Sequence, residues 1–122
     1  MLKIENLNFS YGDLKVLWDV NVEVTEGEIV TVVGANGAGK STILKNISRL
    51  EKPGTGSIIF NGVDLTKLEA HEVVELGVVQ VPEGRKIFPQ MTVTENLRMG
   101  SYTRKARLKR DANMDRVFTM LP

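Results

Sequence analysis

The stretch that decides the fold of this 122-residue chain is Gly34-Ala35-Asn36-Gly37-Ala38-Gly39-Lys40-Ser41. It has the spacing G-x-x-x-x-G-K-[ST], in which glycines allow a tight backbone turn ahead of a lysine and a hydroxyl residue. Ahead of it, the β-branched run Ile29–Val33 predicts a central parallel strand. After it, a helix is predicted from apolar residues that share one face, namely Ile43, Leu44, Ile47 and Leu50. A strand, a glycine loop and a helix in this order predict an α/β fold.

The chemistry predicted for this loop is the binding of phosphate. Its backbone N–H groups can turn inward around phosphate oxygens, and the helix start adds the positive end of its dipole. Lys40 is expected to reach the β- and γ-phosphates of ATP, and the Ser41 hydroxyl to coordinate Mg²⁺. The residues expected to hold the nucleotide phosphates are Gly34, Ala35, Asn36, Gly37, Ala38, Gly39, Lys40, Ser41 and Thr42. Such a loop alone does not separate transport ATPases from nucleotide kinases, GTPases or helicases.

Antiparallel β-structure is expected on both sides of the loop. Alternating apolar and polar residues over Trp18–Val24 predict a half-buried strand, and a similar pattern that starts at Leu2 is interrupted near Asn6. Ser57–Phe60 is predicted to be a strand that turns at Asn61-Gly62 into a small hairpin.

The remaining predicted elements are helices and one more strand. Glu69–Leu76 predicts a short helix, and Val78–Val81 a second buried strand. Thr92 and Glu95 have the spacing of a capping box that begins a helix. Met114–Leu121 repeats the helical period, so we expect an amphipathic helix there.

Composition excludes several kinds of protein. The formal net charge of +1 gives no overall field that favours nucleic acid, and no run is long enough to span a membrane. Cysteine is absent, which excludes disulfides and thiolate metal sites. The charged N-terminus does not have the apolar stretch of a signal peptide.

Further motifs resemble the ATP-binding cassette (ABC) ATPases from end to end. Tyr11 lies in an N-terminal β-segment ahead of the loop, like the aromatic residue that stacks on adenine in that family. Val81-Pro82-Glu83-Gly84-Arg85, Ile87-Phe88-Pro89 and Met91–Leu97 are similar to the ATPases of branched-chain amino-acid importers, the LivF-type subunit. The chain is thus identified as resembling the N-terminal half of such a subunit.

The resemblance implies a domain organisation and partners. Residues 1–27 and 56–65 would form antiparallel β elements, 28–55 and 66–84 the core of a P-loop NTPase, and 85–122 the start of a helical subdomain. The protein is expected on the cytoplasmic, inner face of the cell membrane. Its partners would be permease subunits, docked on Glu83–Phe88, a second ATPase subunit in a homo- or heterodimer and, indirectly, a periplasmic or extracellular binding protein.

One residue departs from the family pattern. Most cassette ATPases have a glutamine directly after this Val-Pro, where it contacts Mg²⁺ and the attacking water, and here the position holds Glu83. Gln80 lies three residues earlier. We expect Glu83 to take the loop role as a catalytic residue and Mg²⁺ ligand, beside Lys40 and Ser41.

Three motifs that the family uses for catalysis do not occur in these residues: a Leu-Ser-Gly-Gly-Gln-like signature, an apolar strand ending in Asp-Glu, and a switch histidine. We therefore expect this chain to bind nucleotide without turnover, and the intact parent to hydrolyse ATP. The alternatives are an ATPase for urea or amide import or for lipid or lipopolysaccharide export, a non-catalytic nucleotide-binding module and, least favoured, a nucleotide kinase.

The basic cluster and the single histidine are both expected at the protein surface. The basic residues Arg104, Lys105, Arg107, Lys109 and Arg110 are expected to be a solvated face of the helical subdomain, with no nucleic acid as partner. His71 is expected in a surface helix without a functional role. Arg85, Ile87 and Phe88 could equally dock a permease or, for Phe88, pack into the local core.

Overall fold

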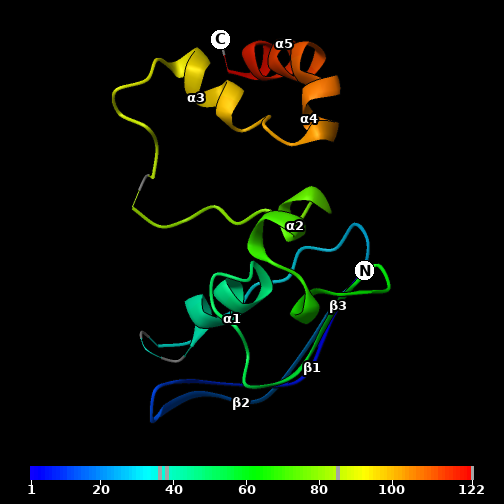
Figure 1. Cartoon of the computed structure of the whole chain (residues 1–122), viewed down its shortest axis with the longest axis vertical. Helices are drawn as coiled ribbons and strands as arrows, with labels where there is room; N and C mark the ends of the chain where they lie inside the picture. Colours follow the sequence, from blue (N-terminus) through cyan, green and yellow to red (C-terminus); the bar gives the residue numbers. More distant parts are fainter. Residues whose placement is uncertain (36, 38, 85, 122) are drawn as a thin grey trace. The chain divides into compact units, whose positions relative to one another are not determined.

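The computed structural model describes residues 1–35, 37, 39–84 and 86–121 (Figure 1). The chain divides into two compact units, Met1–Gln80 and Val81–Pro122, and each is described here by itself. Within the described ranges, no helix combines the length and the apolar character that crossing a membrane requires.

The first unit contains a four-stranded antiparallel sheet. Its strands are β1 (Leu2–Tyr11), β2 (Leu14–Val24), β3 (Thr55–Phe60) and β4 (Val63–Asp64), in the order β2-β1-β3-β4. The hairpin between β3 and β4 turns at Asn61 and Gly62, which both have positive φ (48° and 82°). The predicted antiparallel β-structure and its Asn-Gly turn are confirmed.

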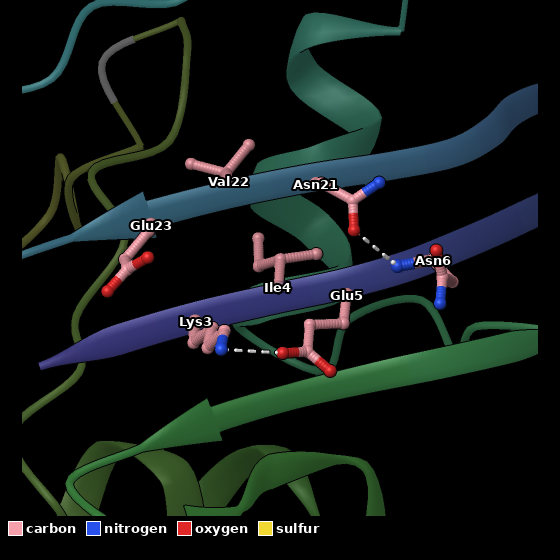
Figure 2. A pocket seen from close by; sticks show the side chains of 7 residues that line it. All are labelled: Lys3, Ile4, Glu5, Asn6, Asn21, Val22 and Glu23. Atoms are coloured by element: carbon pink, nitrogen blue, oxygen red, sulfur yellow. Dashed lines mark hydrogen bonds and ion pairs between the residues drawn. The ribbon is translucent and has the colours of Figure 1, made fainter.

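Three register shifts interrupt the pairing of β1 with β2, and the first two coincide with a residue of positive φ. Asn6 has a φ of 50°, and the register shifts between Ile4 and Leu7, as the sequence pattern indicated. Figure 2 shows how the Asn6 backbone N–H donates to the side-chain oxygen of Asn21, at 3.0 Å, beside a shallow pocket on the two strands. Extra residues of this kind are β-bulges, which bend a strand and change the facing of its side chains.

The second irregularity makes the prediction for Trp18 wrong. Asp19 has a φ of 44°, and Leu17 pairs with Phe9 while Val20 pairs with Leu7. Two residues of β2 therefore stand opposite one of β1, so the alternation reverses. Leu17 becomes buried at 2% exposure, and the Trp18 side chain is 63% exposed.

The core lies where the sheet meets one face of the helices α1 (Lys40–Ile47), η1 (Leu65–Lys67) and α2 (Ala70–Glu75). The predicted helices after the glycine loop and over 69–76 are thus confirmed. Ile43 and Ile47 of α1 pack against this core, but Leu44 is 48% exposed and Leu50, beyond the helix, is 64% exposed. The buried residues of the core are Ile4, Leu7, Phe9, Leu17, Ile58, Leu65 and Val73.

The two predicted parallel strands are absent from the described structure. Ile29–Val33 and Val78–Val81 have no strand conformation, and Ile29, Val33 and Val79 are 94%, 88% and 71% exposed. A parallel strand forms only when a neighbour accepts its hydrogen bonds, and within the described residues all sheet pairing is antiparallel and made by β1–β4. The apolar runs are therefore present without the sheet that would bury them.

The second unit consists of α3 (Val93–Met99), α4 (Arg104–Leu108) and α5 (Arg110–Met120). Thr92 caps α3 because its hydroxyl accepts from the Glu95 N–H at 3.1 Å, so the predicted helix start is confirmed. Glu95 contributes differently from a capping box, since its carboxylate accepts from the Thr92 hydroxyl. The predicted helix over the last residues is confirmed as α5.

Candidate functional site

The glycine loop leads directly into the N-terminus of α1. Gly39 is the cap residue, with a φ of 97°, and its carbonyl accepts the first helical hydrogen bond from Ile43 N at 3.0 Å. The first turn of α1 contains no acidic residue, so no carboxylate of that turn competes with a ligand for the positive end of the helix dipole. An anion is the ligand that this helix end favours.

Gly39 also lies against strand β2. A Cβ atom built on it would be 2.8 Å from Leu17 Cδ2 and 3.3 Å from Val16 Cγ1. Because Leu17 is buried in the core, it cannot move aside easily. The bulge that turns Leu17 inward thereby shapes the surface on which the loop lies, and glycine is required at position 39 for both its φ and its size.

Lys40 closes the loop on itself. Its Nζ donates to the carbonyl oxygen of Gly34 at 2.5 Å, so the ammonium spans the two ends of the motif. An ammonium has three donors, and this bond occupies one of them. Among the described residues the other two donors have no acceptor, and they suit phosphate oxygens held in the turn between Gly34 and Gly39.

Tyr11 reaches the same helix from the end of β1. Its ring packs edge-on against Phe9, with centroids 4.7 Å apart, and its hydroxyl lies 3.5 Å from the Thr42 hydroxyl. Tyr11 is 39% exposed, whereas Thr42 is buried. The structure therefore brings together Tyr11 and Thr42, 31 residues apart in the chain, and leaves part of the tyrosine ring accessible to a ligand.

The expected Mg²⁺ ligands lie in different units. Ser41 is in the first turn of α1, and Glu83 is in the second unit, Val81–Pro122. Among the described residues no three carboxylate, histidine or cysteine side chains gather to hold a metal without help. The donor set at α1 thus fits a metal that a hydroxyl and the phosphate oxygens of a nucleotide hold together. Asn36, Ala38 and Arg85, also expected to contribute, lie outside the described residues.

Sequence reasoning missed a contact behind the site. The Ser48 hydroxyl, just after α1, donates to the side-chain oxygen of Gln80 at 2.7 Å. Inside α1, the fully buried Asn46 donates to the carbonyl of Thr42 at 2.9 Å. Ser48, Gln80 and Asn46 do not belong to the phosphate motif. A hydrogen bond between residues 32 positions apart leaves no local signal in the sequence.

A comparison with protein families decides what this arrangement belongs to. The family model described as ABC transporter matches residues 17–122. The chain belongs to the ABC transporter family. The match includes the glycine loop, α1 and all of the second unit, which confirms the resemblance drawn from the sequence.

Known ABC proteins that resemble the chain include amino-acid transport ATPases. The high-affinity branched-chain amino acid transport ATP-binding protein BraG of Pseudomonas aeruginosa is 41% identical over 100% of this chain and 52% of its own length. The probable branched-chain amino acid transport ATP-binding protein LivF of Archaeoglobus fulgidus is 39% identical over 84% of this chain and 44% of its own length. The chain thus spans about half the length of these relatives.

Solved ABC cassettes share the fold. A dimeric bacterial ABC transporter cassette matches 82% of this chain and 46% of its own, with a TM-score of 0.72 and 29% identity. A dimeric cassette in a post-hydrolysis state, bound to ADP and Pi, matches the same shares with a TM-score of 0.69 and 28% identity. The expected mixed α/β cassette fold with an N-terminal antiparallel sheet is therefore confirmed.

Proposed function

We propose that this chain is the nucleotide-holding part of an ATP-binding subunit that powers an ABC importer for branched-chain amino acids. The observation that carries the nucleotide part is the α1 N-terminus, where Gly39 caps the helix and the Lys40 ammonium lies on the Gly34 carbonyl. The relatives named BraG and LivF support the branched-chain amino-acid part.

The residues at the loop have separate tasks toward ATP. Lys40 neutralises phosphate charge, backbone N–H groups of the loop orient the phosphate oxygens, and the partly exposed Tyr11 stacks on adenine. The Ser41 hydroxyl would hold a Mg²⁺ ion, which would supply positive charge to the phosphates when bound. The Thr42 hydroxyl lies 3.5 Å from the Tyr11 hydroxyl, so the expected adenine-stacking residue lies near the start of α1.

Glu83 takes the position after Val81-Pro82 that most family members fill with glutamine. A carboxylate binds Mg²⁺ more strongly than an amide does, but it adds negative charge near the γ-phosphate. Hydrolysis in the intact parent would then depend more on the position of the permease. Glu83→Gln is expected to raise the Mg²⁺ concentration that the parent ATPase requires and to weaken its coupling to transport; unchanged rate, Mg²⁺ dependence and coupling would contradict this role.

The segment Glu83–Phe88 is the proposed contact with the permease. Ile87 and Phe88 are 66% and 49% exposed, which supports docking over burial in the local core. Asn96 holds the Phe88 backbone from both sides: its oxygen accepts from Phe88 N at 2.9 Å, and its Nδ2 donates to the Phe88 carbonyl at 3.1 Å. Because the Phe88 backbone is fixed in this way, its side chain can dock without a large further loss of entropy.

The wider assembly follows from the same proposal. A second ATPase subunit would pair with this one, since the solved cassettes that resemble it are dimers. The subunits would lie at the cytoplasmic face of the membrane, with a binding protein acting on the other side through the permease. The signature and the Asp-Glu pair do not occur in the 122 residues, so the chain by itself would bind nucleotide without turnover.

Uptake of amino acids by cells that carry the gene tests the transported substrate. Lys40→Ala at the chromosomal locus is expected to abolish energised uptake of radiolabelled leucine, isoleucine and valine, while Lys45→Ala, on the same helix but away from the loop, leaves it intact. Normal uptake of all three in the Lys40→Ala cells would refute the proposed substrate. Loss of urea uptake or lipid export instead would assign the protein to one of those systems.

A further inference from the structure

A dense group of cations lies in α4 and at the two residues that follow it. Arg104, Lys105, Arg107 and Lys109 are all exposed, and they occupy α4 and the residue after it. Arg110 is different: its side chain is half-buried, and its Nε donates to the Ser101 hydroxyl at 2.8 Å. One arginine therefore fixes the segment, and four cations are left facing solvent.

These four cations have no acidic partner in the part of the chain that the structure describes. The ion pairs there are Lys3 with Glu5 and Lys52 with Glu69, both in the first unit. Nine lysines and arginines against four acidic residues give residues 81–122 a formal charge of +5, whereas seven against eleven give residues 1–80 a charge of −4. The net charge of +1 for the chain thus conceals a strongly basic unit.

Apolar side chains lie among the cations. Tyr102 is 45% exposed just before α4, and Leu108, the last residue of that helix, is 82% exposed. Cations interleaved with an aromatic residue and a leucine are the chemistry of segments that lie on a bilayer, where charge meets headgroups and apolar groups enter the acyl boundary.

We propose that the segment Tyr102–Arg110 binds the surface of an anionic phospholipid membrane. The alternative polyanion is a nucleic acid, which would use the cations and stack on Tyr102 but has no place for Leu108. A membrane surface uses all of these groups at once, and each cation near anionic lipid strengthens binding about fivefold. This direct lipid contact goes beyond the proposed function, in which the permease alone holds the subunit at the membrane.

Vesicle flotation tests the proposal, because floating lipid separates bound protein from aggregates. The 122-residue chain is mixed with vesicles of phosphatidylcholine alone or with roughly one phosphatidylglycerol in four. Binding is expected to the anionic vesicles only, and to weaken strongly as salt is raised. Equal flotation with neutral and anionic vesicles would overturn the proposal.

Matched variants locate the site. Lys105→Gln with Arg107→Gln keeps helix propensity and, at about fivefold for each cation, is expected to lower binding to anionic vesicles by about 25-fold. Lys15→Gln with Lys67→Gln removes the same charge from exposed positions of the first unit and is expected to leave binding unchanged. An equal loss in both double variants would contradict a local site.

Two further measurements distinguish membrane binding from nucleic-acid binding and from the proposed nucleotide site. Binding to random-sequence duplex DNA in the absence of binding to anionic vesicles would replace the membrane with nucleic acid as the partner. Lys40→Ala is expected to remove ATP binding and leave vesicle binding intact, so failure of the nucleotide proposal and failure of the membrane proposal are distinguishable. Loss of vesicle binding in Lys40→Ala would overturn an independent lipid site.

Discussion

The Ser48 hydroxyl donates a 2.7 Å hydrogen bond to the side-chain oxygen of Gln80. This bond ties the end of α1, the helix that begins at the phosphate loop, to the chain that continues from α2 toward Glu83. Gln80 is thereby engaged in the first unit. It is the nearest glutamine to the position where most cassette ATPases have their loop glutamine, and its contact with Ser48 supports assigning that loop position to Glu83 instead.

A double-mutant cycle measures the strength of this link. Ser48→Ala and Gln80→Ala are each expected to lower the free energy of unfolding by about 1 kcal/mol, because each leaves a half-buried polar partner without its bond. The double variant should cost less than the sum of the two by a similar amount. Chemical denaturation of the four proteins checks this, and strictly additive losses would show that the two side chains do not interact.

Gly39 and Gly37 form a matched pair for testing the loop. Gly39→Ala is expected to destabilise the chain by about 2 kcal/mol or more, since it combines a positive φ with a contact on buried Leu17. Gly37→Ala has the same kind of φ, 85°, but open space around it, so about 1 kcal/mol is expected. Equal losses in the two variants would mean that β2 does not shape the loop.

Local signals predicted the elements whose stabilising contacts are local. The hairpin at Asn61-Gly62 and the helix start at Thr92 depend on residues next to each other in the chain, and both formed as predicted. The runs Ile29–Val33 and Val78–Val81 have equally strong patterns, yet neither is a strand. Parallel pairing needs distant neighbours, so the pattern specifies what a segment is suited to and not whether its partners are present.

The site shows the same division. The motif predicts Lys40, Ser41 and the glycines as phosphate-binding residues, because phosphate binding constrains consecutive residues. It could not give the packing of Gly39 on Leu17, which depends on a bulge at Asp19 that reverses the facing of β2. The exposure of Trp18 was missed for the same reason. A bulge moves the side chains on one side of it to the opposite face of the sheet, and a short alternating pattern does not reveal where a bulge lies.

Tyr11 can be tested separately from the phosphates. Tyr11→Ala is expected to weaken ATP binding by about tenfold through lost stacking on adenine, and to leave the binding of inorganic triphosphate unchanged. Tyr11→Phe keeps the ring and its edge-on contact with Phe9, so it should bind ATP as the unmodified chain does. Equilibrium titration of both ligands decides the matter, and equal weakening for ATP and triphosphate would assign Tyr11 a purely structural role.

The exposed run Ile29–Val33 predicts self-association. An extended segment with exposed apolar side chains and no sheet partner can pair with the same segment of another chain. The protein is therefore expected to form oligomers whose size increases with protein concentration. Ile29→Lys with Val33→Lys should shift it toward monomer. Leu44→Lys with Leu50→Lys removes two exposed apolar side chains at α1 and just beyond it, and should change little. Light scattering that shows a stable monomer for the unmodified chain would refute this prediction.

The central claim is that Gly34–Ser41 holds the phosphates of ATP. Calorimetric titration of the 122-residue chain with ATP and Mg²⁺, with phosphate release followed in the same samples, tests it most directly. The account predicts saturable binding with one nucleotide per chain, loss of that binding in Lys40→Ala, retention in Lys45→Ala, and no steady release of phosphate. Binding that persists unchanged in Lys40→Ala would contradict the claim.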